Sequence, residues 1–491
     1  MVSNPYQIAL KRTGLFAVGN IGRRGLLFLL LPLYTAYLDP ADLGALALLV
    51  VSGEVLARLV TTPLVVGGVM RFYYHPDYEA RRGVLLFSAG LVLTVLVLLL
   101  AGAWVLAAEP IARWLLPADG AADPVRLTRL YALVVLVNPL GLMLLMFVKL
   151  RAMARYFAVV ALVSAAGTLA VVFVGLHYLD LGLEAAVWGF VAGPAVTVVL
   201  ALPVFVRHAR FRFDPDVLAG PLRFGVPLLP TGLARLVMQL GDRYVLRALV
   251  PAASLGLYDL GYRVGEGLDT VVGTPAYDAV SPTIRQLEAR PDEQRRFIRS
   301  ATTLYYGLAL LAGLALALFA REILLVLARR PEFHPAWVIV PVVVFAMTQQ
   351  VLGSFLEWGL VMRNKAVHLS GILIASAAVN VGLNLALIPL MGIMGAAVAT
   401  LGSVLLWNGL RLYYSARFYD LRFEVGRLSL LTLLAAGVYV VSLAVAPLDG
   451  LGATLAVKAG LWVAFPGLCL ATRLVPWRAL GLLTALWRRS G

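Results

Sequence analysis

Arginine is the most frequent charged residue inside segments that are otherwise long and apolar. Its guanidinium presents a rigid fork of N–H donors that matches phosphate oxygens, so arginines in an apolar setting are suited to holding an anionic group. A charge near mid-bilayer costs roughly 2.5 kcal/mol or more unless it faces a cavity or a partner. The cations in such segments are Arg23, Arg24, Arg58, Arg235, Arg243, Arg263 and Lys458.

Acidic residues occur in the same kind of segment. Carboxylates inside membrane helices often bind a proton or a cation in transporters. The acids in these segments are Glu54, Asp242, Glu266, Asp269, Asp278 and Glu357. We expect ion-coupling sites among Glu54, Glu266, Asp269 and Glu357.

Some of these charges have a simpler interpretation. Glu54 and Arg58 lie four residues apart, which also fits an intrahelical ion pair that lowers the cost of insertion. Asp242 and Arg243 fall near one end of their apolar segment, where water can hydrate them. Asp278 also falls near one end of its apolar segment, where water can hydrate it. Lys458 is expected to extend its ammonium toward the lipid headgroups.

The apolar segments predict an all-α membrane protein with about fourteen transmembrane helices. The chain has 491 residues and is 61% hydrophobic, whereas a soluble protein is about half apolar. Runs of roughly 20 apolar residues cross a bilayer core. The predicted spans are 13–38, 43–70, 82–108, 126–149, 156–179, 183–206, 222–250, 253–282, 297–320, 335–362, 366–389, 392–417, 428–446 and 452–473. The tail from Pro476, with Trp477 and Trp487, is interpreted as an interfacial amphipathic helix.

The basic residues predict the orientation. With the N-terminus in the cytoplasm, about 27 of the 41 Lys and Arg fall on cytoplasmic loops and tails and about 7 fall outside. An even helix count returns the C-terminus to the cytoplasm. The net charge of +15 is therefore explained without a nucleic-acid partner.

Enzyme chemistry is not indicated. The single cysteine, Cys469, excludes a disulfide framework, and the five histidines lack metal-ligand spacing. No nucleotide-binding loop, zinc motif or nucleophile elbow is present. We therefore expect a transporter with no cofactor and no metal site.

An internal repeat divides the chain at an offset of about 211 residues. Arg24 falls on Arg235, Gly53-Glu54 on Gly265-Glu266 and Thr62-Pro63 on Thr274-Pro275. Arg, Glu and Pro are rare in membrane spans, so their agreement carries more weight than matches of Leu or Ala. The repeat predicts an N-terminal six-helix lobe at 1–212, a pseudo-symmetric second lobe at 213–420, and two extra helices with a tail at 421–491.

Nearly all of the intramembrane charges fall on the first and second spans and on the seventh and eighth, which correspond in the repeat. We expect these spans to surround a central polar cavity, as in transporters built from repeats. Arg24 and Arg235 lie near mid-span without an acid three or four residues away. Pro63 and Pro275 are repeat-matched helix bends and are the hinge candidates. The candidate substrate-binding residues are Asn20, Arg23, Arg24, Arg58, Arg235, Tyr262 and Arg263.

Three stretches resemble the Wzx-type polysaccharide and O-antigen flippases of the multidrug/oligosaccharidyl-lipid/polysaccharide (MOP) exporter superfamily. Residues 241–244 with 255–263 resemble the helix 7–8 region of that family, and residues 380–399 resemble its helix 11–12 signature. Leu38-Asp39-Pro40 followed by Leu43-Gly44 resembles its helix 1–2 turn. The resemblance covers roughly the first 420 residues.

The resemblance implies a flippase that works by alternating access. It would move an undecaprenyl-diphosphate-linked oligosaccharide, a repeat unit of O-antigen, capsule or exopolysaccharide, from the cytoplasmic to the periplasmic leaflet. The candidate substrate-binding residues would then contact its diphosphate or sugars. The chain would be a multi-pass monomer of the bacterial inner membrane, with polysaccharide polymerase or export proteins as possible partners.

Two relatives of that family are alternatives. MurJ-type lipid II flippases also have two extra helices and have lumenal arginines on helices 1 and 8, where Arg23 or Arg24 and Arg263 would correspond. Multidrug and toxic compound extrusion (MATE) antiporters predict an acid-dominated lumen and usually twelve helices, which fits the arginines less well. A membrane glycosyltransferase would need larger extramembrane loops than this chain has.

Overall fold

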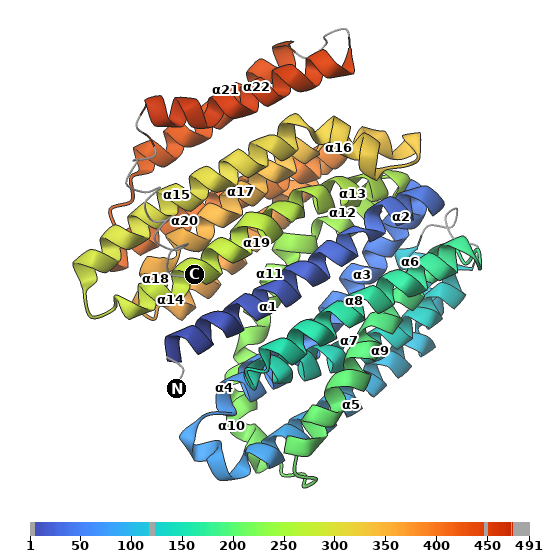
Figure 1. Ribbon diagram of the computed structural model, residues 1–491. Helices are drawn as coiled ribbons and strands as arrows, with labels where there is room; N and C mark the ends of the chain where they lie inside the picture. Colours follow the sequence, from blue (N-terminus) through green and yellow to red (C-terminus); the bar gives the residue numbers. More distant parts are fainter. Residues whose placement is uncertain (1–4, 117–122, 446–449, 473, 475–491) are drawn as a thin grey trace. The chain divides into compact units, whose positions relative to one another are not determined.

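The computed structural model describes residues 5–116, 123–445, 450–472 and 474, and every regular element in these ranges is a helix (Figure 1). The predicted all-α fold is confirmed. The tail from Pro476 lies outside the described residues. The chain forms two compact units, residues 1–257 and 258–491, and the boundary falls within α13 (Ala252–Leu268). The predicted lobe boundaries at 212 and 420 stay a prediction.

The first unit contains fifteen elements before α13, of which η1 is π-helical and η2 and η3 are 3₁₀ turns. They are α1 (Pro5–Phe28), α2 (Leu30–Tyr37), α3 (Pro40–Thr61), η1 (Thr62–Val69), α4 (Met70–Phe72), η2 (Pro76–Arg81), α5 (Arg82–Leu106), α6 (Ala108–Leu115), α7 (Pro124–Leu150), α8 (Ala154–His177), α9 (Leu183–His208), α10 (Asp216–Gly225), η3 (Val226–Leu228), α11 (Leu229–Leu240) and α12 (Asp242–Leu249).

The second unit continues from α13 and contains a π-helical element, η4, and a 3₁₀ element, η5. Its elements are η4 (Asp269–Gly273), α14 (Thr274–Gln286), α15 (Pro291–Leu318), α16 (Ala320–Leu327), η5 (Pro331–Val338), α17 (Val340–Leu356), α18 (Trp358–Met362), α19 (Ala366–Met391), α20 (Ile393–Phe418), α21 (Val425–Val445) and α22 (Leu451–Ala471). The last two helices lie side by side (Figure 1).

Twelve helical segments in the described ranges are long and apolar enough to cross a bilayer, so the predicted count of fourteen is not confirmed. The other two predicted spans coincide with α1–α2 and with α13–α14, which are helical. Charges lower their hydropathy: α1 carries Arg23 and Arg24, and α13 carries Asp259, Arg263 and Glu266. The segments that fail as apolar spans are therefore those that hold many of the candidate site residues.

The turn between α2 and α3 follows from three residues. Leu38 is extended, Asp39 is the N-cap of α3, and Pro40 occupies the first turn, where its missing N–H is not needed. The Asp39 carboxylate accepts a hydrogen bond from the backbone N–H of Asp42 at 2.8 Å. Asp42 completes a capping box. These contacts fix the start of the helix that carries Glu54 and Arg58.

Backbone features recur at about the offset of the sequence repeat. Gly182 and Gly392 precede α9 and α20 with φ of 52° and 59°, a left-handed conformation that favours glycine. Ala152 and Asn364 precede α8 and α19 with φ of 54° and 51°. The short helices α6 and α16 each follow a long span and have eight residues. The repeat is therefore visible in local structure as well as in residue types.

The repeat-matched Gly44 and Gly256 lie against each other. A Cβ built on Gly44 would lie 3.2 Å from the backbone N of Gly256, and one built on Gly256 would lie 3.0 Å from the N of Gly44. A Cβ on Gly256 would also overlap the carbonyl oxygen of Pro40. This reciprocal contact is what a two-fold relation between repeats produces.

Gly256→Ala is expected to lower the free energy of unfolding by about 1–3 kcal/mol, because the new methyl group meets backbone that cannot rotate away. The measurement is the thermal unfolding midpoint of the purified protein in detergent. Gly102→Ala is the matched control, since an added Cβ there meets nothing within 4 Å. Equal midpoints for the two variants would contradict the close packing at Gly256.

The segment between α9 and α10 is tied to the start of α5. Arg81 forms an ion pair with Asp214, whose backbone N–H donates to Ser88 Oγ at 3.0 Å. Desolvation raises the pKa of the Asp214 carboxyl, but the hydrogen bond and charge of Arg81 and the backbone N–H groups of Asp216 and Val217 outweigh it, so the net pKa is lowered. Asp214 lies outside the candidate spans.

Asp214→Asn is expected to lower the unfolding midpoint at neutral pH and to have no effect in strong acid. The folded-state pKa is depressed, so the stabilisation is present above the ordinary value of 3.8 and is lost as pH falls through the folded-state value. The check is the difference in midpoint between parent and variant across a pH series. A difference that persists well below the ordinary value would rule out the ion pair as its source.

Candidate substrate-binding site

Three candidate arginines in unit 1 are grouped around one acid. Arg23 and Arg24 are exposed on α1. The charge of Arg23 interacts with those of Arg24 and Glu54. Glu54 Oε2 lies 3.7 Å from Arg58 Nε, and both side chains are about 40% exposed. The intrahelical pair expected from their spacing is present, and the group keeps an excess of positive charge.

Arg235 lies on α11, which packs antiparallel to α3. Gly232 on α11 faces Thr62, and the hydroxyl of Tyr244, further along the chain, lies 2.8 Å from Ser52 Oγ. This register places Arg235 near the height of Arg58 along α3, since each helical residue advances about 1.5 Å. Arg235 is exposed and makes no ion pair with any residue that the structure describes.

The hydroxyl groups of two tyrosines lie against α3. Tyr131 is buried, and its hydroxyl lies where a Cβ on Gly53 would otherwise stand. The Glu54 charge acts on Tyr131. Sequence reasoning missed Tyr131 and Tyr244, because tyrosine is not rare enough in membrane spans to attract notice. The one available signal was Gly53, which the repeat pairs with Gly265.

Asn20 is half-buried on α1, one turn before Arg23 and Arg24. Its amide offers donors and acceptors of the kind that recognise sugar hydroxyls. In the first unit, the charge interaction of Arg23 with Glu54 links α1, which carries Asn20, Arg23 and Arg24, to the Glu54–Arg58 pair on α3.

In unit 2 the charges of α13 are already balanced in part. Arg263 Nε donates to Asp259 Oδ2 at 2.6 Å, one turn away on the same helix. Tyr262 is 1% exposed and packs against Tyr258, with ring centroids 5.7 Å apart. Glu266 and Asp269 are exposed, and Asp269 accepts a hydrogen bond from Thr274 at 3.1 Å. The roles of these residues stay predictions.

Glu357 has a partner that sequence reasoning missed. Arg411 Nη2 lies 2.9 Å from Glu357 Oε2, with the Arg411 side chain 5% exposed. The Arg411 guanidinium also stacks on Trp407, 3.6 Å from the ring centre. Beside it, Asn408 donates to the carbonyl of Gln349 at 2.6 Å. The signal was Asn408 and Arg411 at helical spacing within a span.

The structure shows that two expectations about charged residues are wrong. Lys458 does not extend toward headgroups: its Nζ lies 2.6 Å from Glu322 Oε1, and both side chains are mostly buried. Asp242 and Arg243 are not hydrated, because they form a 2.8 Å ion pair and are 3% and 2% exposed. Each pair replaces hydration by a protein partner, which a charge inside a span requires.

The hinge candidates both adjoin π-helical backbone. Pro63 lies at the start of η1, and Pro275 lies just after η4. Proline removes a backbone donor and its ring crowds the preceding turn, and a π-helical stretch widens the helix locally. The matched placement supports the prediction that these positions bend, while their motion stays a prediction.

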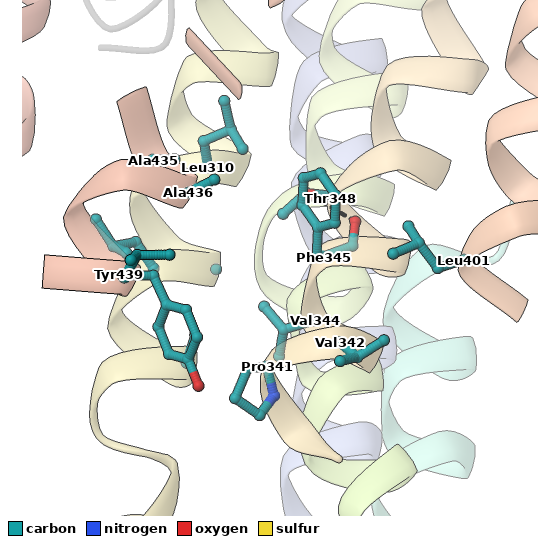
Figure 2. A pocket seen from close by; sticks show the side chains of 14 residues that line it. Leu310, Pro341, Val342, Val344, Phe345, Thr348, Leu401, Ala435, Ala436 and Tyr439 are labelled. Carbon is teal, nitrogen blue, oxygen red and sulfur yellow. Dashed lines mark hydrogen bonds between the residues drawn. The ribbon is translucent and has the colours of Figure 1, made fainter. Parts of the chain in front are cut away.

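Unit 2 also contains an apolar pocket of about 210 Å³ between α15, α17, α20 and α21 (Figure 2). Thr348 and the hydroxyl end of Tyr439 are the polar groups that line it, among residues such as Leu310, Val344 and Phe345. A pocket of this composition suits a hydrocarbon chain and offers nothing to bind an ion.

The arrangement in unit 1 is suited to binding an anion. Among the described residues, no group of three or more His, Cys, Asp or Glu side chains is placed to hold a metal ion. The exposed guanidinium groups can donate paired hydrogen bonds to phosphate oxygens.

Solved structures with the same fold are transporters. The structure of the lipid II flippase MurJ in an inward closed conformation is 12% identical and gives a TM-score of 0.73, covering 94% of this chain and 99% of that chain. An inward-facing MATE family transporter of the MOP superfamily is 15% identical, with a TM-score of 0.62 over 84% of this chain and 95% of that one. An outward-facing MATE transporter is 14% identical, with a TM-score of 0.55 over 86% and 97%. The predicted likeness to this superfamily is confirmed in fold.

No curated protein sequence matches the chain. A family model described as "Polysaccharide biosynthesis protein" matches residues 37–330. The match spans more than half of the chain and includes α3, α11 and α13. The chain belongs to the polysaccharide biosynthesis protein family.

Proposed function

We propose that the protein is a flippase for undecaprenyl-diphosphate-linked oligosaccharide, moving a repeat unit from the cytoplasmic to the periplasmic leaflet by alternating access. The observation that carries the proposal is the group of Arg23, Arg24 and Arg58 around a single acid, on helices of a multi-pass chain from a polysaccharide biosynthesis family.

The chemistry of such a substrate fits this group. A lipid diphosphate is anionic, and in a site with little water it needs fixed cationic donors. The exposed arginines supply those donors, with Arg235 at a similar height along α3. Asn20 and Tyr244 add neutral hydrogen-bonding groups of the kind that sugars require. The polyprenyl tail stays in an apolar environment throughout.

Lipid II transport is the second candidate. Its support is the fold shared with a lipid II flippase over 94% of this chain. A MATE-type cation antiporter is disfavoured, because the cations around Glu54 outnumber the acids and would repel a cationic drug.

The proposal also includes the orientation of the chain and the membrane in which it lies. With both termini in the cytoplasm, the basic loops lie on the side where the lipid-linked unit is assembled. A bacterial inner membrane supplies both the undecaprenyl carrier and an ion gradient. Glu266 and Asp269, exposed on α13 and η4, are the coupling candidates that the proposal favours.

Complementation tests the two candidates directly. The chain is expressed in bacterial strains that lack either an O-antigen flippase or the lipid II flippase, with the matching glycan genes supplied. Restored surface glycan with no rescue of peptidoglycan synthesis supports the proposal. Rescue of peptidoglycan synthesis alone would assign the chain to lipid II. Drug resistance without either rescue would overturn both in favour of an antiporter.

A further inference from the structure

Three cationic side chains at one end of unit 2 make cation–π contacts with two aromatic rings. The guanidinium carbons of Arg295 and Arg363 lie 5.0 and 5.2 Å from the ring centre of Tyr419. The Lys365 ammonium lies 4.8 Å from the ring centre of Phe418, the neighbouring residue. Contacts of this kind hold cations in place without neutralising their charge.

Tyr419 is a fixed support for these cations. It is 6% exposed, and its hydroxyl donates to Gln294 Oε1 at 2.5 Å. Gln294 is 2% exposed and donates in turn to the carbonyl of Ile284 at 2.8 Å. The ends of α14 and α20 are thereby tied to the first turn of α15. The cations are held by a buried framework rather than by flexible loops.

The nearby acids do not balance this charge. Asp292 lies 3.5 Å from Arg295, but its side chain is 82% exposed, so the pair is weak. Asp420 is paired with Arg422 at 2.8 Å. Within the described ranges, Arg363 and Lys365 make no ion pair, and the Nε–H of Arg295 is buried without a hydrogen-bond partner. Arg363 is exposed, so its guanidinium donors are available to an anion.

The cluster lies at the ends of apolar spans. Arg295 is in the first turns of the span Pro291–Leu318, and Arg363 directly follows the span Val340–Met362. Lys365 directly precedes Ala366–Met391, and Tyr419 directly follows Ile393–Phe418. Residues at the ends of bilayer-spanning helices lie at the depth of lipid phosphates, whereas a soluble anion would meet them only from the water side.

We propose that Arg295, Arg363 and Lys365, supported by Tyr419 and Phe418, form a binding site for the phosphate headgroup of an anionic glycerophospholipid. The site is formed by residues of unit 2, whereas the arginines of α1, α3 and α11 belong to unit 1, and the proposal does not depend on what the protein transports. Scattered interfacial arginines attract anionic lipid only through their summed charge. This cluster adds fixed geometry, so removing it costs more than removing the same charge elsewhere.

Native mass spectrometry of the full chain in detergent tests the site. The probes are phosphatidylglycerol, phosphatidylcholine and undecaprenyl diphosphate, each titrated separately. The site variant is Arg295→Gln with Arg363→Gln. The control is Arg321→Gln with Arg329→Gln, which removes two exposed arginines elsewhere in unit 2. Size-exclusion profiles and phosphatidylcholine adducts show that each variant is folded.

The parent and the control are expected to bind phosphatidylglycerol about tenfold more tightly than phosphatidylcholine, the effect of two to three cations beside an anionic headgroup. The site variant is expected to lose most of that preference. Equal losses in site variant and control would overturn the proposal in favour of unspecific charge. Tighter binding of undecaprenyl diphosphate than of phosphatidylglycerol, lost in the same variant, would instead make the cluster a substrate site. None of these outcomes depends on the complementation result.

Discussion

Glu357→Gln is expected to lower the free energy of unfolding by about 3–5 kcal/mol, because it leaves a buried guanidinium without its carboxylate. Arg411 is 5% exposed and lies 2.9 Å from Glu357. Glutamine keeps the size of the side chain and an acceptor oxygen, so the variant isolates the loss of charge. The stacking of Arg411 on Trp407 remains in the variant. We therefore expect the loss in free energy of unfolding to lie toward the lower end of that range.

The measurement is thermal unfolding of purified variants in detergent at one scan rate, because membrane proteins often unfold irreversibly. Arg126→Gln is the control: it breaks a 3.1 Å ion pair with Glu184 in which the arginine side chain is 68% exposed. The free energy of unfolding lost in this control should stay within about 1 kcal/mol.

A double variant separates charge from packing. Glu357→Gln with Arg411→Met removes both charges, and it should recover much of the stability lost in the single variant, because no unpaired charge is left buried. A double variant that is less stable than Glu357→Gln would contradict the account. So would a single variant no less stable than the Arg126→Gln control.

The Glu357–Arg411 pair also affects which acids can bind a coupling ion. A cation that binds Glu357 must compete with Arg411, and protonation of Glu357 would leave a buried positive charge. Glu266 and Asp269 are exposed, so binding a proton or a cation there requires less rearrangement. Glu357 remains a candidate only for a mechanism in which the pair with Arg411 opens.

The sequence predicted features that depend on local rules. The turn at Leu38-Asp39-Pro40 was predictable because the cap, the proline and the apolar run act within a few residues. The Glu54–Arg58 pair was predictable from helical spacing. The repeat was predictable because Arg, Glu and Pro are rare in membrane spans.

Partners that are distant in sequence were not predictable. Lys458 and Glu322 are separated by 136 residues, and no spacing rule links α22 with α16. Arg411 falls near the end of its span, where an arginine is ordinarily exposed at the interface, and only the fold shows that it is buried. The same holds for Tyr131, whose contact with α3 depends on how α7 packs.

Replacing Arg24 and Arg235 together by alanine is expected to reduce flipping about 100-fold or more. A hydrogen bond to a charged group contributes about 1.5–3 kcal/mol, and two such losses exceed the roughly 2.8 kcal/mol that corresponds to 100-fold. Both side chains are exposed, so truncation should leave the fold intact. The readout is surface glycan in the complemented strain, normalised to the amount of protein in the membrane.

Lysine replacements and a distant arginine make the test specific. Arg24→Lys with Arg235→Lys keeps the charge but loses the paired donors, so it should retain more activity than the alanine pair and less than the parent. Arg129→Ala removes an exposed arginine near the start of α7 and should transport normally. If the alanine pair flips as well as the parent at equal expression, the arginines do not bind the diphosphate and the anionic site must lie elsewhere in the chain. If the lysine pair equals the parent, charge alone is sufficient and the phosphate is not held by bidentate hydrogen bonds.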